Sequence, residues 1–192
     1  MVLGFARIVV TGGGRVAGGA VEILKHAGVK EISPDDYLSA SYKYPVFTRL
    51  DPWHYTRPRD GSAFDFNHFM EHPEMYENQF TPYARRTDVF VACHFWDPAS
   101  PLMLTREDLA GGDMPISLVA DISCDIKGPI ASTIRASTIA SPFYGYDPQT
   151  DQEVLPFEKG SITVMAVDNL PGELPRDASA DFGSALMEQV IP

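Results

Sequence analysis

The residues with the clearest chemical potential form a glycine-rich run near the N-terminus. Gly12, Gly14 and Ala17 fit the spacing G-x-G-x-x-A. In that pattern the first glycine permits a tight turn, the second lets the backbone approach a pyrophosphate, and the alanine lets a helix lie close to a strand. Free N–H groups at the start of the helix would bind the phosphates. The run therefore predicts a dinucleotide site; a glycine turn that only packs and a methyltransferase-type adenosine site are the competing interpretations.

An acidic residue about 20 positions after the glycine run is expected to bind the adenine ribose. Asp35 and Asp36 stand at that distance, but the residue that ends the second expected strand is Ser33, which is not an acid. The competing interpretation of the two aspartates is a helix N-cap after Pro34. The choice between NAD and NADP stays open, with Asp36 as the candidate ribose ligand.

Further polar side chains stand at or just beyond the ends of three β-branched runs. They are His94, Asp121, Asp125 and Asp168. In a doubly wound sheet the ligand binds at the carboxyl ends of the strands, and acids there are costly unless they face a polar cleft. The competing interpretation is that the acids cap loops and helices. For His94, a hydrogen bond to a loop is favoured over contact with a nicotinamide.

The elements that must position these residues alternate between strand and helix. Strands are expected at 7–11, 29–33, 46–50, 88–93, 117–121 and 162–167, and helices at 16–26, from 105 onward and at about 176–190. This order predicts an α/β protein with a Rossmann-type, doubly wound, mainly parallel sheet and helices on both faces.

The stretch at about 37–86, called the insert below, interrupts this alternation. It is irregular and rich in proline and aromatic residues, and so many aromatics indicate a packed segment rather than a disordered one. Short helices are expected within it at 66–70 and 75–83.

Charge and cysteine content exclude several classes of protein. The 192 residues include 15 Lys and Arg against 26 Asp and Glu, and no basic run that could bind nucleic acid or an anionic membrane. Only two cysteines, Cys93 and Cys124, are present, which excludes a disulfide framework and favours a reduced, cytoplasmic location. No metal is expected, because His68 and His72 lack a third ligand and Pro73 interrupts their helix.

Four motifs resemble the saccharopine dehydrogenase and lysine–2-oxoglutarate reductase family, which shares its fold with alanine dehydrogenase. They are Gly14–Ala20, Phe95–Pro98, Asp121–Asp125 and Asp168–Ser179. The resemblance extends over nearly the whole chain and includes the part of the insert around His72–Tyr76. The resemblance implies an NAD(P)-dependent dehydrogenase of lysine metabolism. It would transfer hydride between nicotinamide and the C–N carbon of an adduct of an amino acid and a 2-oxo acid. An alanine dehydrogenase-like enzyme and a non-catalytic NAD(H)-binding module are the alternatives.

The resemblance also implies roles for single residues. Asp125 is implied near the nicotinamide and substrate, and Asp168 matches an acid found in the saccharopine branch of the family. These two acids are the candidate catalytic residues. The residues implied to contact the cofactor lie in the glycine turn and in a later loop: Gly12, Gly14, Arg15, Val16, Asn169, Leu170 and Pro171.

A two-domain enzyme is implied as well. The whole chain, 1–192, would be its dinucleotide-binding domain, and the helix at about 176–190 would return to a missing N-terminal catalytic domain. That domain carries the acid–base lysine and histidine of the family, so the chain alone is expected to be inactive. Small amino acid and 2-oxo acid substrates and the missing domain are the expected partners, and a homo-oligomer is left open.

Overall fold

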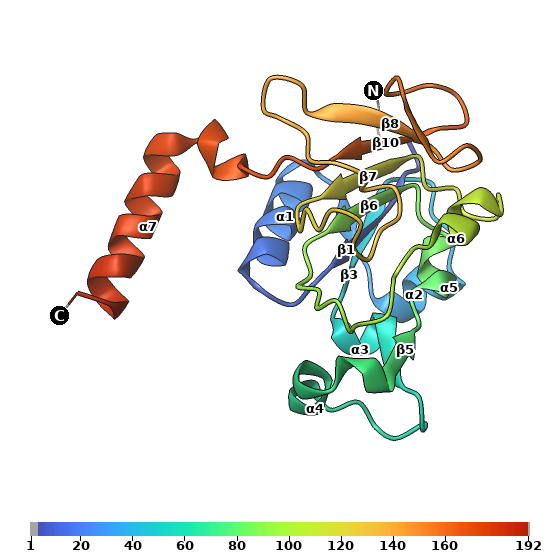
Figure 1. The fold of residues 1–192 in the computed structure, drawn as a ribbon, viewed down its shortest axis with the longest axis horizontal. Helices are drawn as coiled ribbons and strands as arrows, with labels where there is room; N and C mark the ends of the chain where they lie inside the picture. The colour runs from blue at the N-terminus through green and yellow to red at the C-terminus, as the bar shows by residue number, and fades with distance from the viewer. Residues whose placement is uncertain (1–3, 192) are drawn as a thin grey trace.

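One sheet of eight strands forms the centre of the computed structural model, which describes residues 4–191 (Figure 1). Its strands are β1 (Arg7–Thr11), β2 (Lys30–Glu31), β3 (Val46–Leu50), β6 (Val89–Ala92), β7 (Leu118–Asp121), β8 (Phe143–Asp147), β9 (Gln152–Val154) and β10 (Ile162–Met165). The order across the sheet is β2-β3-β1-β6-β7-β10-β8-β9. The strands from β2 to β10 in this order are parallel, and β8 and β9 continue the sheet in antiparallel fashion.

Helices cover both faces of this sheet. The helices of the described residues are α1 (Arg15–His26), α2 (Pro34–Ser39), α3 (Pro52–Tyr55), α4 (Phe66–Glu71), α5 (Thr81–Ala84), α6 (Arg106–Ala110) and α7 (Pro175–Gln189), with 3₁₀ turns η1 (Pro73–Met75) and η2 (Leu170–Glu173). Successive side chains of β1 point to opposite faces of the sheet, as in any β-strand. Ile8 and Val10 pack with Ala17 of α1, and Val9 packs in the core that contains Tyr37 of α2. The doubly wound α/β fold is thus confirmed.

The residue types at two helix ends suit the backbone conformations found there. Gly28 follows α1 with a φ of +77°, the left-handed conformation that suits a residue just past a helix end. Thr105 caps α6, accepting a hydrogen bond from the backbone N–H of Asp108 at 3.1 Å. The second strand is shorter than expected, because Ser33 leaves it to cap α2 and accepts a hydrogen bond from the N–H of Asp36 at 3.1 Å.

The insert contains a second, two-stranded sheet that the sequence did not predict. Strands β4 (Thr56–Pro58) and β5 (Tyr76–Asn78) pair antiparallel. The expected helix at 75–83 is wrong, since η1, β5 and α5 occupy that stretch. Pro82 stands in the first turn of α5 and cannot lie inside a longer helix, because proline lacks the N–H that such a helix needs.

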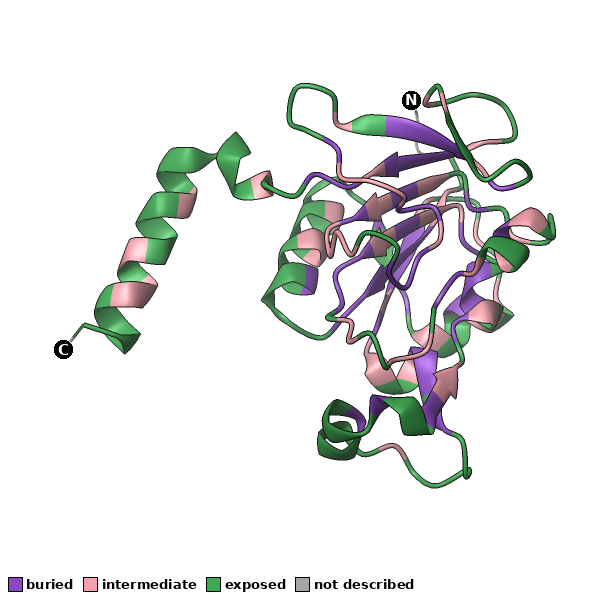
Figure 2. Ribbon diagram, viewed as in Figure 1, coloured by how far each residue is buried: buried purple, intermediate pink, exposed green. Residues whose placement is uncertain are grey.

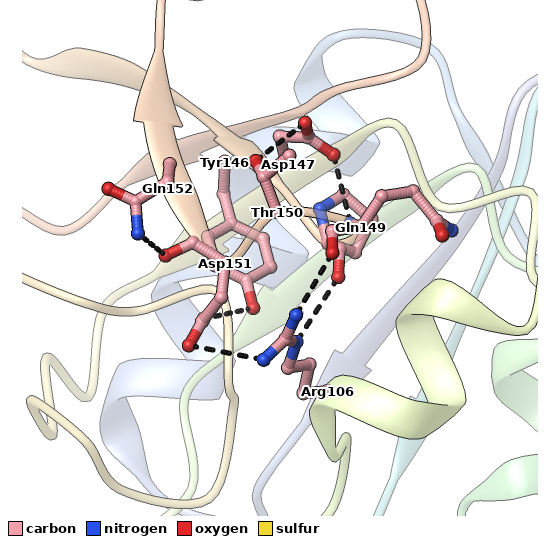
Figure 3. Close-up of polar contacts among 8 residues, drawn as sticks. Arg106, Tyr146, Asp147, Gln149, Thr150, Asp151 and Gln152 are labelled. Carbon is pink, nitrogen blue, oxygen red and sulfur yellow. Dashed lines mark hydrogen bonds and ion pairs between the residues drawn. The ribbon is translucent and has the colours of Figure 1, made fainter.

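The β8–β9 hairpin was also missed. Gly145 interrupts the apolar pattern of β8, and a side chain there would collide with the backbone carbonyl of Leu155. Figure 3 shows how the turn of the hairpin is tied to α6. Arg106 donates to the carbonyl oxygen of Gln149 at 2.9 Å, and the buried Tyr146 hydroxyl donates to Asp151 at 2.8 Å. The local bond from Tyr146 and the long-range bond from Arg106 together stabilise a turn for which the local sequence gives only a weak signal.

The last helix, α7, stands away from the sheet (Figure 1). It has no buried residue, in contrast to the central strands (Figure 2), and Phe182 and Met187 are largely exposed. Within residues 4–191, none of the helices combines the length and apolar character that crossing a membrane requires. The expected domain of residues 1–192 includes residues 1–3 and 192, which lie outside the described part.

Candidate functional site

A cleft of about 640 Å³ opens at the carboxyl ends of β3, β1, β6 and β7. We call it the glycine-turn cleft. Its lining comes from the glycine turn, α3, α4 and the ends of β6 and β7: Gly12, Gly13, Gly14, Arg15, Val16, Asp51, Pro52, Trp53, Tyr55, Phe66, Phe69, Met70, Cys93, His94, Phe95, Ile122 and Ser123. The strands that follow β1, namely β2 and β3, lie on one side of it, and β6, β7 and β10 lie on the other side. Doubly wound sheets bind their ligands at the point where the order of the strands reverses in this way.

The glycine turn has the geometry that a phosphate cradle needs. Gly12 has a φ of +110°, and a Cβ there would lie 2.6 Å from the carbonyl oxygen of Cys93. Gly14 precedes α1 without a side chain to cap the helix, so the first N–H groups of α1 stay free for an anion. A Cβ on Gly14 would meet nothing within 4 Å, and Ala17 is fully buried. The backbone at Gly12, the open space at Gly14 and the burial of Ala17 are compatible with the three predicted roles, and phosphate binding itself stays a prediction.

Asp51 is the acid that the structure brings to this turn, and sequence reasoning missed it. It follows Leu50, the last residue of β3, and its Oδ1 atom lies 2.6 Å from where a Cβ on Gly13 would stand. Its backbone N–H donates to His54 Nδ1 at 3.0 Å, and its carboxylate lies 3.4 Å from the Arg49 guanidinium. The signal was present, because an acid directly follows the expected strand at 46–50.

The acids chosen from their spacing lie elsewhere. Asp35 and Asp36 occupy the first turn of α2, and both are outside the lining of the cleft. Ser33, rather than either aspartate, is the N-cap of that helix. The rule of about 20 residues assumes that the second strand lies beside the first, but here β2 is the edge strand and β3 lies between β2 and β1.

His94 lies at the floor of the cleft, where it accepts or donates one short hydrogen bond. Its Nδ1 atom is 2.7 Å from the Thr11 hydroxyl, and its ring stacks on Phe90. Among the described residues Nε2 has no hydrogen-bond partner. Burial lowers the pKa of His94 from 6.5 to about 4, although the charge of Asp121 acts in the opposite direction. The imidazole is therefore neutral at pH 7, and its bond to Thr11 replaces the loop contact that the sequence favoured.

We expect His94 to make the fold less stable in mild acid. Because its folded pKa is lowered, the unfolded chain takes up a proton between pH 6.5 and 4 and the folded chain does not. The free energy of unfolding is thus fully retained above pH 6.5 and falls as the pH decreases toward 4. This group alone contributes a loss of about 2 kcal/mol between pH 7 and pH 5. Urea unfolding of the wild type and His94→Gln at both pH values measures it; equal pH dependence in the two proteins would contradict the expectation.

Asp121 holds the loop that borders the cleft beyond β7. It is fully buried and accepts hydrogen bonds from the Ser123 hydroxyl at 2.5 Å, the Cys124 N–H at 3.0 Å and the Thr133 hydroxyl at 2.6 Å. Ser123 itself lines the cleft. Asp121 thus corresponds to the capping interpretation of the strand-end acids, and it fixes one wall of the site.

The two acids proposed as catalytic lie outside the lining of the cleft. Asp125 is half-buried, and burial, followed by the charge of Asp121, raises its pKa above the ordinary value. Asp168 is exposed after β10. The charges of Asp121, Asp168 and Asp125 all raise the pKa of Cys124, after the larger effect of its burial. The charges of the three acids therefore all act on the Cys124 thiol.

The later loop expected to contact the nicotinamide forms the start of η2. Asn169 precedes this turn, and Leu170 and Pro171 are its first residues. Pro171 shares a groove with Arg15 and with Phe182 of α7. Arg15 also lines the glycine-turn cleft, as does Val16. Arg15 therefore lines both the groove beside α7 and the glycine-turn cleft.

No protein-family model matches the chain. An alpha-aminoadipic semialdehyde synthase of Arabidopsis thaliana is 32% identical to it over 93% of the chain and 19% of the synthase. The mitochondrial alpha-aminoadipic semialdehyde synthase of Bos taurus is 28% identical over 98% of the chain and 23% of its own length. A saccharopine dehydrogenase (NAD(+), L-lysine-forming) of Neurospora crassa is 26% identical over 96% of the chain and 40% of the dehydrogenase.

The chain is homologous to these enzymes. The relationship to saccharopine dehydrogenases and alpha-aminoadipic semialdehyde synthases confirms the resemblance that the four motifs indicated. The chain spans roughly a fifth of the length of the two synthases. The name of the fungal dehydrogenase includes NAD(+), and that of the bovine synthase includes the mitochondrion, whereas the cytoplasmic location expected for this chain stays a prediction.

Proposed function

We propose that the chain is the dinucleotide-binding part of an NAD(P)-dependent oxidoreductase of lysine metabolism. The enzyme would transfer hydride between nicotinamide and the C–N carbon of an adduct of an amino acid and a 2-oxo acid. The proposal rests on how three features of the cleft are placed relative to one another. The glycine turn, the uncapped start of α1 and the Asp51 carboxylate converge on the same side of the sheet, as pyrophosphate and ribose binding would require.

The residues of the cleft fit such a group and suggest how they would act on it. A bound nicotinamide dinucleotide would supply the hydride chemistry. The N–H groups of α1 would hold the phosphates, and the Asp51 carboxylate would accept a hydrogen bond from a ribose hydroxyl. His94 is neutral and brings no charge to the floor, while Ile122 and Phe95 contribute apolar walls. Asp125 and the loop from Asn169 to Pro171 are proposed to act nearer the nicotinamide and substrate.

Proton transfer is proposed to need a second domain. The side chains of the cleft that can ionise near neutral pH reduce to His94, which is buried and hydrogen-bonded to Thr11. The groove between Arg15 and α7, and the exposed apolar residues of α7, support the packing of another domain against this side. By itself the chain would then bind the dinucleotide with little turnover, as a binding module does.

Replacing Asp51 with Asn should change the choice of cofactor. Asp51→Asn removes a charged acceptor for the ribose 2′-OH, so the dissociation constant for NAD should rise about tenfold. NADP should bind more tightly than before, because the variant no longer repels a 2′-phosphate and leaves Arg49 free to bind it. Calorimetric titration with both cofactors measures the two constants.

Asp36→Asn is the matched control for this experiment. It removes the same charge from an exposed position on α2, outside the cleft, and should leave both constants unchanged. If Asp36→Asn lost affinity for NAD and Asp51→Asn did not, Asp36 of α2 would be the ribose ligand. That result would remove the main support for the proposal.

A further inference from the structure

We infer that α4 of the insert and Trp53 of α3 together form the pocket for the adenine ring, an inference that rests on the proposed function. The glycine-turn cleft continues past Asp51 onto Trp53, Phe66 and Met70. These three large side chains are each about half exposed, at 51%, 51% and 48%. Single exposed apolar residues are ordinary on a protein surface, but several that line one concave site indicate a binding pocket for an apolar group.

The insert holds α4 so that part of its apolar surface stays free. Asp65 caps the helix, accepting a hydrogen bond from the N–H of His68 at 2.8 Å. Phe69 is buried and packs edge-on against Tyr76 of β5, with ring centroids 4.9 Å apart. The β4–β5 hairpin therefore anchors the helix through Phe69.

The two remaining apolar residues of α4 face the cleft. Phe66 and Met70 are four positions apart, so they lie on one face of the helix, one above the other. Trp53 belongs to the same aromatic group, since its ring lies 6.2 Å from that of Phe64, which in turn contacts Phe69. The cleft is thus bordered here by an indole, a phenyl ring and a thioether that are all anchored to the insert.

Adenine is the part of the cofactor that this place fits. The start of α1 binds the pyrophosphate in the proposed function, and Asp51 binds the adenine ribose. Trp53 follows Asp51 by two residues, so a base carried on that ribose is within reach of the indole and of α4. A flat aromatic base stacks well on aromatic faces, and methionine sulfur contacts aromatic rings favourably. The nicotinamide end would lie on the other side of the glycine turn, toward the ends of β6 and β7.

The test uses ADP-ribose, which contains the adenosine and pyrophosphate but no nicotinamide. In the double variant Phe66→Ala/Met70→Ala, its dissociation constant should rise about 10- to 30-fold, in line with the loss of stacking on one base. Both side chains are half exposed, so the melting temperature should change little. Met75→Ala is the matched control: Met75 is 49% exposed in η1 of the same insert but does not line the cleft.

Tryptophan fluorescence gives a second readout. The chain has two tryptophans, so Trp96→Phe leaves Trp53 as the only emitter. ADP-ribose should then quench the emission of Trp53. Unchanged emission, or binding by the double variant as tight as by the wild type, overturns the adenine pocket and leaves the proposed function standing if Gly14→Val still abolishes binding. A wild-type chain that binds neither NAD nor ADP-ribose would overturn both.

Discussion

Gly14→Val is expected to lower the affinity for NAD by roughly 100-fold or more, because the branched side chain would occupy the space through which the backbone approaches the pyrophosphate. The fold should tolerate the change. Gly14 has extended backbone angles, with φ at −90°, and a Cβ there meets nothing within 4 Å. The cost at the helix start should stay below about 1 kcal/mol. Calorimetry gives the affinity and thermal unfolding the stability.

Gly19→Ala serves as the matched control for Gly14→Val. It adds a side chain to the same helix at an exposed position outside the cleft. A glycine-to-alanine change inside a helix stabilises it by about 1 kcal/mol, so this variant should melt slightly higher and bind NAD as the wild type does. If Gly14→Val and Gly19→Ala bound NAD with equal affinity, the glycine turn would not be the phosphate site.

Asp121→Ala is expected to reduce the free energy of unfolding by about 3–5 kcal/mol. The carboxylate accepts three hydrogen bonds, from Ser123, Cys124 and Thr133, and all of these donors would lose their partner. The Thr133 hydroxyl belongs to a fully buried residue, so water cannot easily replace the lost acceptor. Urea unfolding at pH 7 measures the change.

Asp125→Asn tests whether the effect belongs to Asp121 or to any negative charge in this loop. Asp125 is half-buried near Asp121, and removing its charge relieves repulsion rather than breaking a bond. Its free energy of unfolding should stay within about 0.5 kcal/mol of the wild type. In the two-domain enzyme proposed above, the same variant should lose turnover while it keeps its melting temperature. If Asp125→Asn destabilised the protein more than Asp121→Ala, Asp125 rather than Asp121 would be the acid that holds this loop.

Features encoded in short stretches of sequence were predicted well. The β-branched runs gave β1, β3, β6, β7 and β10, because a parallel strand buried on both faces needs such a run. The glycine turn and the start of α6 followed from residue types that suit only a few backbone conformations. These signals are local, and the tertiary structure had no reason to override them.

Features that depend on which elements become neighbours were not predicted. Asp51 was overlooked because its place in the cleft depends on β3, rather than β2, lying beside β1. The β8–β9 hairpin depends on Arg106, which reaches it from a distant part of the chain. The apolar wall of the cleft depends on the placement of the insert, whose irregular sequence has no periodic pattern. In each case the deciding contact joins segments that are far apart in sequence.

The position of β3 between β1 and β2 also bears on the order in which the protein folds. Within residues 4–191 β2 pairs with β3 alone, so β2 joins the sheet only once β3 has docked on β1. Asp51 follows Gly12 by 39 positions, and closing that loop costs entropy before any ligand can use both residues. A ligand that contacts both binds only the docked chain and stabilises it by mass action. A bound cofactor would therefore stabilise the docked state of β2 and β3, and it should slow hydrogen exchange most in these two strands.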